Sequence, residues 1–169
     1  LFHSEAVAFT SPTLTDTEDV ESRDSKPRGL AFNNDGTKFY LASASNKEIN
    51  VYDLTTAWDL TTAVHKCAEA HWTTGNTNAR HIAFSADGTY MFVMRGGNTG
   101  TDYVYRYLLS APFDVCDGYT SGSGSDSSYV LGGSNFINVN SQQDEGNGLA
   151  FSPDGKNMYI TGTEDASTD

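Results

Sequence analysis

RGLAFNNDGTKFYL (residues 28–41) is the stretch that decides the fold, because it recurs twice without gaps. The further copies are RHIAFSADGTYMFV (residues 80–93) and NGLAFSPDGKNMYI (residues 147–160). Each copy joins two apolar segments through a polar turn that ends in Asp-Gly, and glycine readily takes the positive φ of a tight turn. The sequence therefore predicts three β-hairpins. Their turn residues are Asp35-Gly36, Asp87-Gly88 and Asp154-Gly155.

Further strand-like segments follow the first two hairpins. Residues 49–54 (INVYDL) and 104–109 (VYRYLL) are rich in β-branched or aromatic side chains, which favours a third strand in each unit. Less regular segments at residues 63–68 and 136–139 are predicted as fourth strands. Residues 6–9 occupy the place of a fourth strand before the first hairpin. Each unit is thus expected to contain four strands.

A corner of similar sequence follows each third strand. TTAWDL (residues 55–60) aligns with SAPFDV (residues 110–115), so an aromatic residue followed by Asp recurs at the same offset. We interpret the two aromatic residues, Trp58 and Phe113, as plugs that pack the corner onto the edge of the sheet. Stacking on a ligand is the alternative role.

The strand composition predicts sheets that are covered on both faces. Residues 29–32 and 39–42 are apolar at successive positions, whereas a half-exposed strand alternates apolar and polar residues. Four-stranded sheets stacked radially provide this cover, and repeats of about 40–50 residues are typical of β-propeller blades. The sequence therefore predicts an all-β protein, a β-propeller of four-stranded antiparallel blades with about three blades in this chain. A solenoid is the alternative fold.

Small residues in the first strand of each hairpin fit the crowded region near a propeller axis, where neighbouring blades converge. They are Gly29, Ala31, Ala83, Gly148 and Ala150. The repeats also set the expected domain organisation. It comprises the end of a preceding blade with an acidic linker (1–27), a blade (28–79), a blade with a Gly/Ser-rich insertion at 118–128 (80–146), and the first hairpin of a further blade (147–169).

The patterns GLAF-S-x-DG-x-x-MY-I and V-Y-x-Y-x-L, followed by an S/T-x-P/A-aromatic-D corner, extend over roughly residues 28–162. In these patterns the chain resembles bacterial and phage surface β-propeller repeats of the YVTN and NHL-like families. The resemblance implies binding or scaffolding without catalysis. A closed propeller has about four to eight blades. We therefore expect further blades from the same longer chain or from other subunits of a homo-oligomer.

The chain is acidic, with 22 Asp and Glu against 10 Lys and Arg and a net charge of -12. This charge repels phosphates, so no nucleic acid is expected as a partner. No apolar run approaches the roughly 20 residues of a membrane-spanning helix, and no membrane insertion is expected. Cys67 and Cys116 match no CxxC motif. They form one disulfide between adjacent blades or remain two separate buried thiols.

Binding residues are predicted from the register of the repeats. Arg28, Arg80 and Asn147 immediately precede the innermost strand, which would array them around the channel mouth as donors to an anionic or carbonyl ligand. In the alternative, each Arg pairs with a loop carboxylate of a neighbouring blade, such as Asp24 or Glu145.

His81 replaces Gly29 and Gly148 of the sister repeats, which would point it into the central channel. A satisfied or solvent-exposed histidine is the alternative. The acidic residues of the linker (16–24) are expected in a solvated loop, and the Asp-Gly aspartates in normal turns rather than calcium loops. The four histidines show no compact ligand spacing. We therefore expect no metal and no cofactor.

The sequence contains neither a nucleophile elbow nor a phosphate-binding Gly loop. We therefore expect that the chain is not an enzyme but an extracellular, cell-surface or virion-surface β-propeller for adhesion, decoration or assembly, with protein or glycan as its partner. One alternative is a propeller-type hydrolase or lactonase with a channel metal. The other is a glycan-binding lectin that stacks sugars on Trp58, Trp72 and Phe113.

Overall fold

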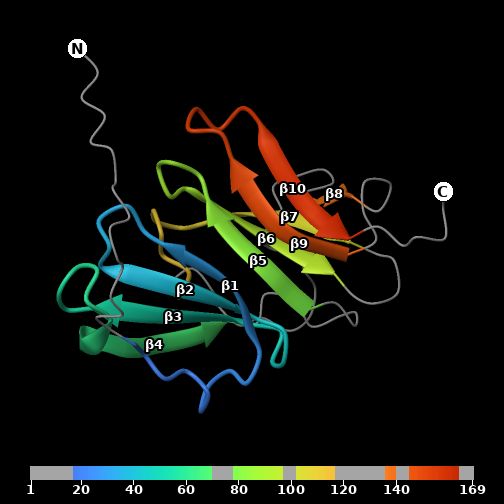
Figure 1. The fold of residues 1–169 in the computed structure, drawn as a ribbon. Coiled ribbons are helices and arrows are strands. Elements are labelled where there is room, and N and C mark those ends of the chain that lie inside the picture. Colours follow the sequence, from blue (N-terminus) through green and yellow to red (C-terminus); the bar gives the residue numbers. More distant parts are fainter. Residues whose placement is uncertain (1–16, 70–77, 97–101, 117–135, 140–144, 164–169) are drawn as a thin grey trace, which may run out of the picture.

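The fold is described by a computed structural model that covers residues 17–69, 78–96, 102–116, 136–139 and 145–163. These residues form three antiparallel sheets that follow one another along the chain (Figure 1). The first two sheets have four strands each, and the third has two strands within the described residues. The predicted all-β fold of four-stranded antiparallel propeller blades is therefore confirmed.

Each sheet is built in sequence order, so every connection joins neighbouring strands. Blade 1 contains β1 (Pro27–Phe32), β2 (Lys38–Ser43), β3 (Ile49–Leu54) and β4 (Ala63–Glu69), with a 3-10 turn η1 (Leu60–Thr62) before β4. Blade 2 contains β5 (Asn78–Phe84), β6 (Tyr90–Gly96), β7 (Tyr103–Leu108) and β8 (Phe136–Asn138). Blade 3 contains β9 (Glu145–Phe151) and β10 (Met158–Thr163).

The first strand of each blade begins one or two residues earlier than the repeat predicts. In β1 and β5 this extension coincides with an irregular register, between Pro27 and Gly29 and between Ala79 and His81. A bulge lets pairing continue past a residue that breaks the alternation, and the repeat pattern does not reveal it. The strand predicted at 6–9 and the insertion at 118–128 lie outside the described residues.

Apolar side chains fill both boundaries between blades, as the strand composition predicts. Between blades 1 and 2, Ile49 and Val51 of β3 and Ile82 and Met91 of blade 2 are at most 1% exposed. A second cluster between blades 2 and 3 includes Met94, Val104, Val139 and Leu149. Blade 2 is therefore buried on both faces, which is the arrangement of a blade inside a stack.

The innermost strands β1 and β5 approach each other very closely. A Cβ atom added at Gly29 would lie 2.7 Å from the Cα atom of His81 and 3.1 Å from the carbonyl oxygen of Arg80. Both distances are shorter than ordinary van der Waals contact, so a side chain at Gly29 would force the strands apart. The predicted need for a small residue near the axis is confirmed at this position.

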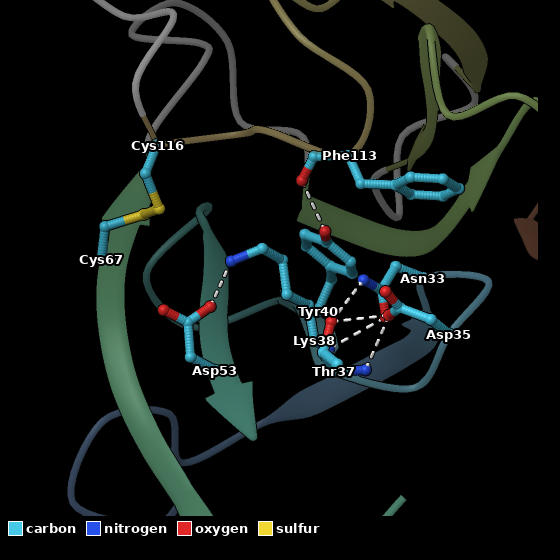
Figure 2. Close-up of polar contacts among 9 residues, drawn as sticks. All are labelled: Asn33, Asp35, Thr37, Lys38, Tyr40, Asp53, Cys67, Phe113 and Cys116. Atoms are coloured by element: carbon cyan, nitrogen blue, oxygen red, sulfur yellow. Dashed lines mark hydrogen bonds and ion pairs between the residues drawn. A yellow bond between two sulfur atoms is a disulfide. The ribbon is translucent and has the colours of Figure 1, made fainter. Parts of the chain in front are cut away.

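A disulfide joins blades 1 and 2 at their outer side. Cys67 of β4 is bonded to Cys116, which follows β7, and the two Cα atoms are 6.1 Å apart (Figure 2). The two cysteines are 49 residues apart in the sequence. Of the two alternatives left open by the sequence, the structure thus has the disulfide. Separately, no helix within the described ranges is long and apolar enough to cross a bilayer.

Candidate functional site

The Asp-Gly turns form one rim of the blade stack, and their polar groups are satisfied locally. In blade 1, an Asp35 carboxylate oxygen accepts hydrogen bonds from the Thr37 hydroxyl at 2.6 Å and the Thr37 amide at 3.0 Å (Figure 2). The hydroxyl, followed by the amide, holds the pKa of Asp35 below its ordinary value. The Asp35 carboxylate therefore stabilises the turn, as predicted.

The other two turns repeat this pattern. Asp87 accepts hydrogen bonds from the Ser85 hydroxyl and the Thr89 amide, and Asp154 accepts them from the Ser152 hydroxyl and the Lys156 amide. In both cases the serine hydroxyl is the largest cause of a lowered pKa. Gly36, Gly88 and Gly155 all have a φ of about 70° (71°, 72° and 69°).

The two corner aromatics pack directly on the turn glycines. Trp58 and Phe113 both have a left-handed backbone, with φ of 65° and 60°, which is strained for bulky residues. Each donates its backbone N–H to the carbonyl oxygen of a turn glycine at 2.9 Å, Trp58 to Gly36 and Phe113 to Gly88. A Cβ atom at either glycine would lie 2.2 Å from the nearest ring atom. The ring therefore takes the space that a larger turn residue would need.

Blades 1 and 2 contact each other at the corner that contains Phe113. The Tyr40 hydroxyl donates a 2.6 Å hydrogen bond to the backbone carbonyl oxygen of Phe113 (Figure 2). The Phe84 ring lies between them, with centroids 4.6 Å from the Tyr40 ring and 5.3 Å from the Phe113 ring. Tyr40 is fully buried, and this burial raises the pKa of its phenol.

The same place between blades 2 and 3 is an open groove of about 510 Å³. Phe92 and Phe151, whose rings are 4.4 Å apart, form its apolar floor. The turns that contain Asp87 and Asp154 flank it. A Cβ atom added at Gly155 would meet nothing within 4 Å.

On the side opposite these turns, the structure brings Arg80 and Asn147 together. The Arg80 guanidinium donates to the Asn147 side-chain oxygen at 3.0 Å and forms an ion pair with Glu145 at 3.3 Å. Arg80 is only 3% exposed, so it is a buried link between blades 2 and 3. For Arg80 the alternative of pairing with a neighbouring blade is therefore confirmed.

Arg28 does not join this group. It is exposed at the start of β1, and the described hydrogen bonds of Asp24, the other carboxylate suggested as an arginine partner, are with other groups. The carboxylate of Asp24 instead accepts hydrogen bonds from the Lys26 amide at 2.9 Å and the Ser45 hydroxyl at 2.7 Å. The expectation that the whole acidic linker is solvated also fails at Asp24, which is 1% exposed because these bonds fold the loop over it.

His81 is partly buried, and its burial lowers its pKa. Its Nδ1 atom is buried without a hydrogen-bond partner among the described residues. Of the two further candidates on the turn rim, Trp58 is 60% exposed and Phe113 is partly buried. Trp72 lies outside the described residues.

Sequence reasoning missed two buried charged residues near the link between blades 2 and 3. Asp102 is fully buried and accepts a hydrogen bond from the Gly146 amide of blade 3. Arg95 is 1% exposed, and its guanidinium lies 4.5 Å from the centre of the Tyr105 ring. The repeats gave no signal, because Arg95 aligns with Ser43 and Gly162. Across the described ranges, no group of three or more His, Cys, Asp or Glu is placed to hold a metal ion.

No protein-family model matches this sequence, and no curated protein matches it either. Among solved structures, the chain is similar to the periplasmic gluconolactonase PpgL of Pseudomonas aeruginosa, with 23% sequence identity and a TM-score of 0.47. The match covers 79% of this chain and 32% of the gluconolactonase, so the chain spans about a third of that protein's length. At this identity the likeness concerns the fold alone. The resemblance to YVTN and NHL-like repeats stays a prediction.

This comparison contradicts the expectation that the chain is not an enzyme, because the similar protein is named as one. The expectation rested on the lack of compact catalytic motifs in the sequence. A propeller assembles a site from side chains on several blades, and such a site leaves no short motif. The exclusion of catalysis is therefore withdrawn. No substrate and no catalytic residue follow from the comparison.

Proposed function

We propose that the chain is a segment of an extracytoplasmic β-propeller that acts as a protein-binding and assembly module. Its contact surfaces would be the apolar faces of its first and last blades. The observation that carries this proposal is the exposure of residues that are buried at the same register elsewhere in the stack.

The face of blade 1 that points away from blade 2 supplies the first case. Leu30 is 54% exposed, whereas its counterparts Ile82 in β5 and Leu149 in β9 are 1% and 5% exposed. Ile82 packs against blade 1, and Leu149 packs against blade 2. Leu30 differs from them only in having no blade on that side among the described residues. An apolar side chain in this position favours contact with further protein.

The outward face of blade 3 supplies the second case. Tyr159 of β10 is 59% exposed, whereas Tyr40 occupies the same register in β2 and is fully buried. Tyr40 reaches the corner of blade 2, so the counterpart partner of Tyr159 would belong to a following blade. Tyrosine is well suited to such a contact because it combines a large apolar ring with a hydrogen-bonding hydroxyl.

Two further features support an extracytoplasmic location. The Cys67–Cys116 disulfide ties two blades together, and structural disulfides persist in oxidising surroundings such as the periplasm or the outside of a cell. The net charge of -12 favours solubility at high local concentration. A cell-surface or virion-surface location, with adhesion, decoration or assembly as the role, agrees with both features.

Sedimentation of the full chain over a range of concentrations tests the proposal. Leu30→Lys and Tyr159→Lys place a charge on the two terminal faces, and Val64→Lys is the matched control, because Val64 is 58% exposed on the outer strand β4. We expect self-association of the wild type, weakened about tenfold or more by each terminal-face variant and unchanged by the control. A wild type that stays monomeric, or equal effects of all three variants, would contradict the proposal.

A further inference from the structure

The groove between blades 2 and 3 continues into a second one. This second groove has a volume of about 320 Å³ and shares Phe92 and Phe151 with the first. Val104, Ile137 and Met158 are among its other lining residues. Because Phe92 and Phe151 line both, the two adjoin as one continuous groove that runs from the Asp154-Gly155 turn towards β7 and β8. Its lining is mostly apolar but includes Asp87 and Asp154 at the turns and Arg106 of β7.

The first groove corresponds to the site of a corner aromatic. Phe92 and Phe151 occupy the register of Tyr40 and Phe84, and between blades 1 and 2 the Phe113 ring packs against Phe84. The turn glycines agree with this correspondence. The ring of Phe113 fills the space over Gly88, whereas the same space over Gly155 is empty.

The second groove corresponds to the surface against which a third strand packs. Between blades 1 and 2, β7 packs Tyr107 against a cluster that contains Ile49 and Val51 of blade 1. Val104 aligns with Ile49 and Arg106 aligns with Val51, so the equivalent packing surface for blade 3 lies over Val104 and Arg106, which both line the second groove. Its neighbour Ile137 is 55% exposed. β10 also pairs only with β9 among the described strands, whereas β2 and β6 each pair with two strands.

We infer that this continuous groove binds a third strand and an aromatic-Asp corner that complete blade 3, supplied by polypeptide that continues after β10. The inference rests on the proposed function and identifies the partner of its last blade. In blades 1 and 2 the third strand and corner follow the hairpin directly in the sequence, which favours a continuing polypeptide over a second copy.

The geometry of the first two corners defines how this segment binds. Its strand pairs antiparallel with the open edge of β10, as β3 pairs with β2. Its aromatic residue donates a backbone N–H to the Gly155 carbonyl and lays its ring over the Gly155 Cα atom, as Phe113 does at Gly88. The Asp that follows the aromatic residue in the corner motif has a counterpart in Asp59, whose carboxylate accepts the Thr61 amide at 3.0 Å.

A peptide taken from the chain itself serves as the probe. The peptide YVYRYLLSAPFD (residues 103–114) contains a complete third strand and corner. It is added to the intact chain, and amide hydrogen exchange is measured along β10. We expect slower exchange of the β10 amides and of Gly155, while β4 is unchanged. A peptide in which Phe113 is replaced by Ala should bind about tenfold or more weakly, because a buried aromatic anchor carries much of such a contact.

A variant of the chain tests the same contact from the side of the groove. Gly155→Ala puts a methyl group where the incoming ring would lie, although in the chain alone this methyl group meets no other atom. Circular dichroism should show that the variant folds. The preference for the Phe-containing peptide over its Ala version should then be lost.

The outcomes separate this inference from the proposed function. Absence of binding up to about 1 mM peptide, or equal binding of the two peptides, would overturn the inference that the groove binds an aromatic corner. If the terminal-face variants still weaken self-association, the proposed function survives that result. Protection of β10 that rises with chain concentration in the Tyr159→Lys variant, without peptide and without the outward-face contact, would show that a second copy fills the groove, and would overturn the assignment to a continuing polypeptide.

Discussion

The boundary between blades 1 and 2 and the boundary between blades 2 and 3 are built from copies of one hairpin repeat, yet among the described residues only the first is closed at the rim of Asp-Gly turns. At the closed boundary the Phe113 ring covers Gly88 and the Phe113 carbonyl accepts a hydrogen bond from Tyr40. At the other boundary the space over Gly155 is empty. The difference shows that a hairpin does not complete its own side of a boundary. A corner about 25 residues further along the chain does so, as the separation of Gly88 and Phe113 indicates.

The comparison also separates residue type from position in the stack. Tyr40 and Tyr159 are the same residue at the same register, yet one is fully buried and the other is 59% exposed. Burial here is therefore a property of having a neighbouring blade. Matched substitutions at equivalent positions therefore measure what each boundary contributes to the stability of the fold.

Removing the disulfide should weaken the closed boundary most. A bond between residues 49 apart restricts the unfolded chain enough to stabilise the fold by about 4 kcal/mol in the chain-entropy estimate. Cys67→Ala combined with Cys116→Ala should therefore lower the free energy of unfolding by roughly 2–4 kcal/mol. Urea denaturation of the double variant and of the oxidised wild type measures this difference. An unchanged midpoint with an unchanged slope would mean that the bond does not stabilise the boundary.

The turn glycines should differ sharply between the two boundaries. Alanine at a φ near 70° costs about 1–2 kcal/mol at either Gly88 or Gly155 because the left-handed region is unfavourable for a residue with a Cβ atom. Gly88→Ala must also displace the Phe113 ring, which adds about 1–3 kcal/mol of overpacking. Thermal and urea unfolding of the two variants should thus rank Gly88→Ala well below Gly155→Ala. Equal losses would show that the ring does not hold the turn.

The tyrosine pair isolates one hydrogen bond. Tyr40→Phe removes the donor to the Phe113 carbonyl and should cost about 1 kcal/mol or somewhat more, because the bond is buried. Tyr159→Phe should change the free energy of unfolding by less than about 0.5 kcal/mol, since its ring is 59% exposed. Urea unfolding of both variants checks the contrast. A loss at Tyr159 as large as that at Tyr40 would argue against the difference between the two boundaries.

The repeat made most of the blade architecture predictable from the sequence. The Asp-Gly turns and the alignment of Trp58 with Phe113 are local patterns, and both appear in the structure with the geometry that their residue types require. The need for a small residue at Gly29 was also predictable, because it follows from how blades converge.

The polar contacts between blades were less predictable. Arg80 and Glu145 are 65 residues apart in the sequence, and the sequence left that pair as one of two alternatives. Asp102 and Arg95 have no equivalent in the other repeats, so alignment gives no reason to bury them. Asp24 was expected in solvent, because its hydrogen bonds to Ser45 and Lys26 depend on how the loop folds back. Contacts of this kind follow from the stacking of blades, which no single repeat encodes.

The smallest effect should come from His81, which replaces the Gly29 of β1 and the Gly148 of β9. Burial lowers its pKa in the folded state below the ordinary value of 6.5. Above pH 6.5 both states are neutral at this residue, but as the pH falls below that value the unfolded chain binds the proton first, so stability is lost.

His81→Gln should therefore flatten the decline in unfolding free energy on acidification below pH 6.5, measured by urea denaturation at a series of pH values. His65 needs the same treatment as a control, because burial also lowers its pKa and it titrates in the same window. The effect should be shallow, since both rings keep part of their solvent contact. A decline that is as steep in the double variant as in the wild type would show that neither histidine causes the loss of stability in this pH range.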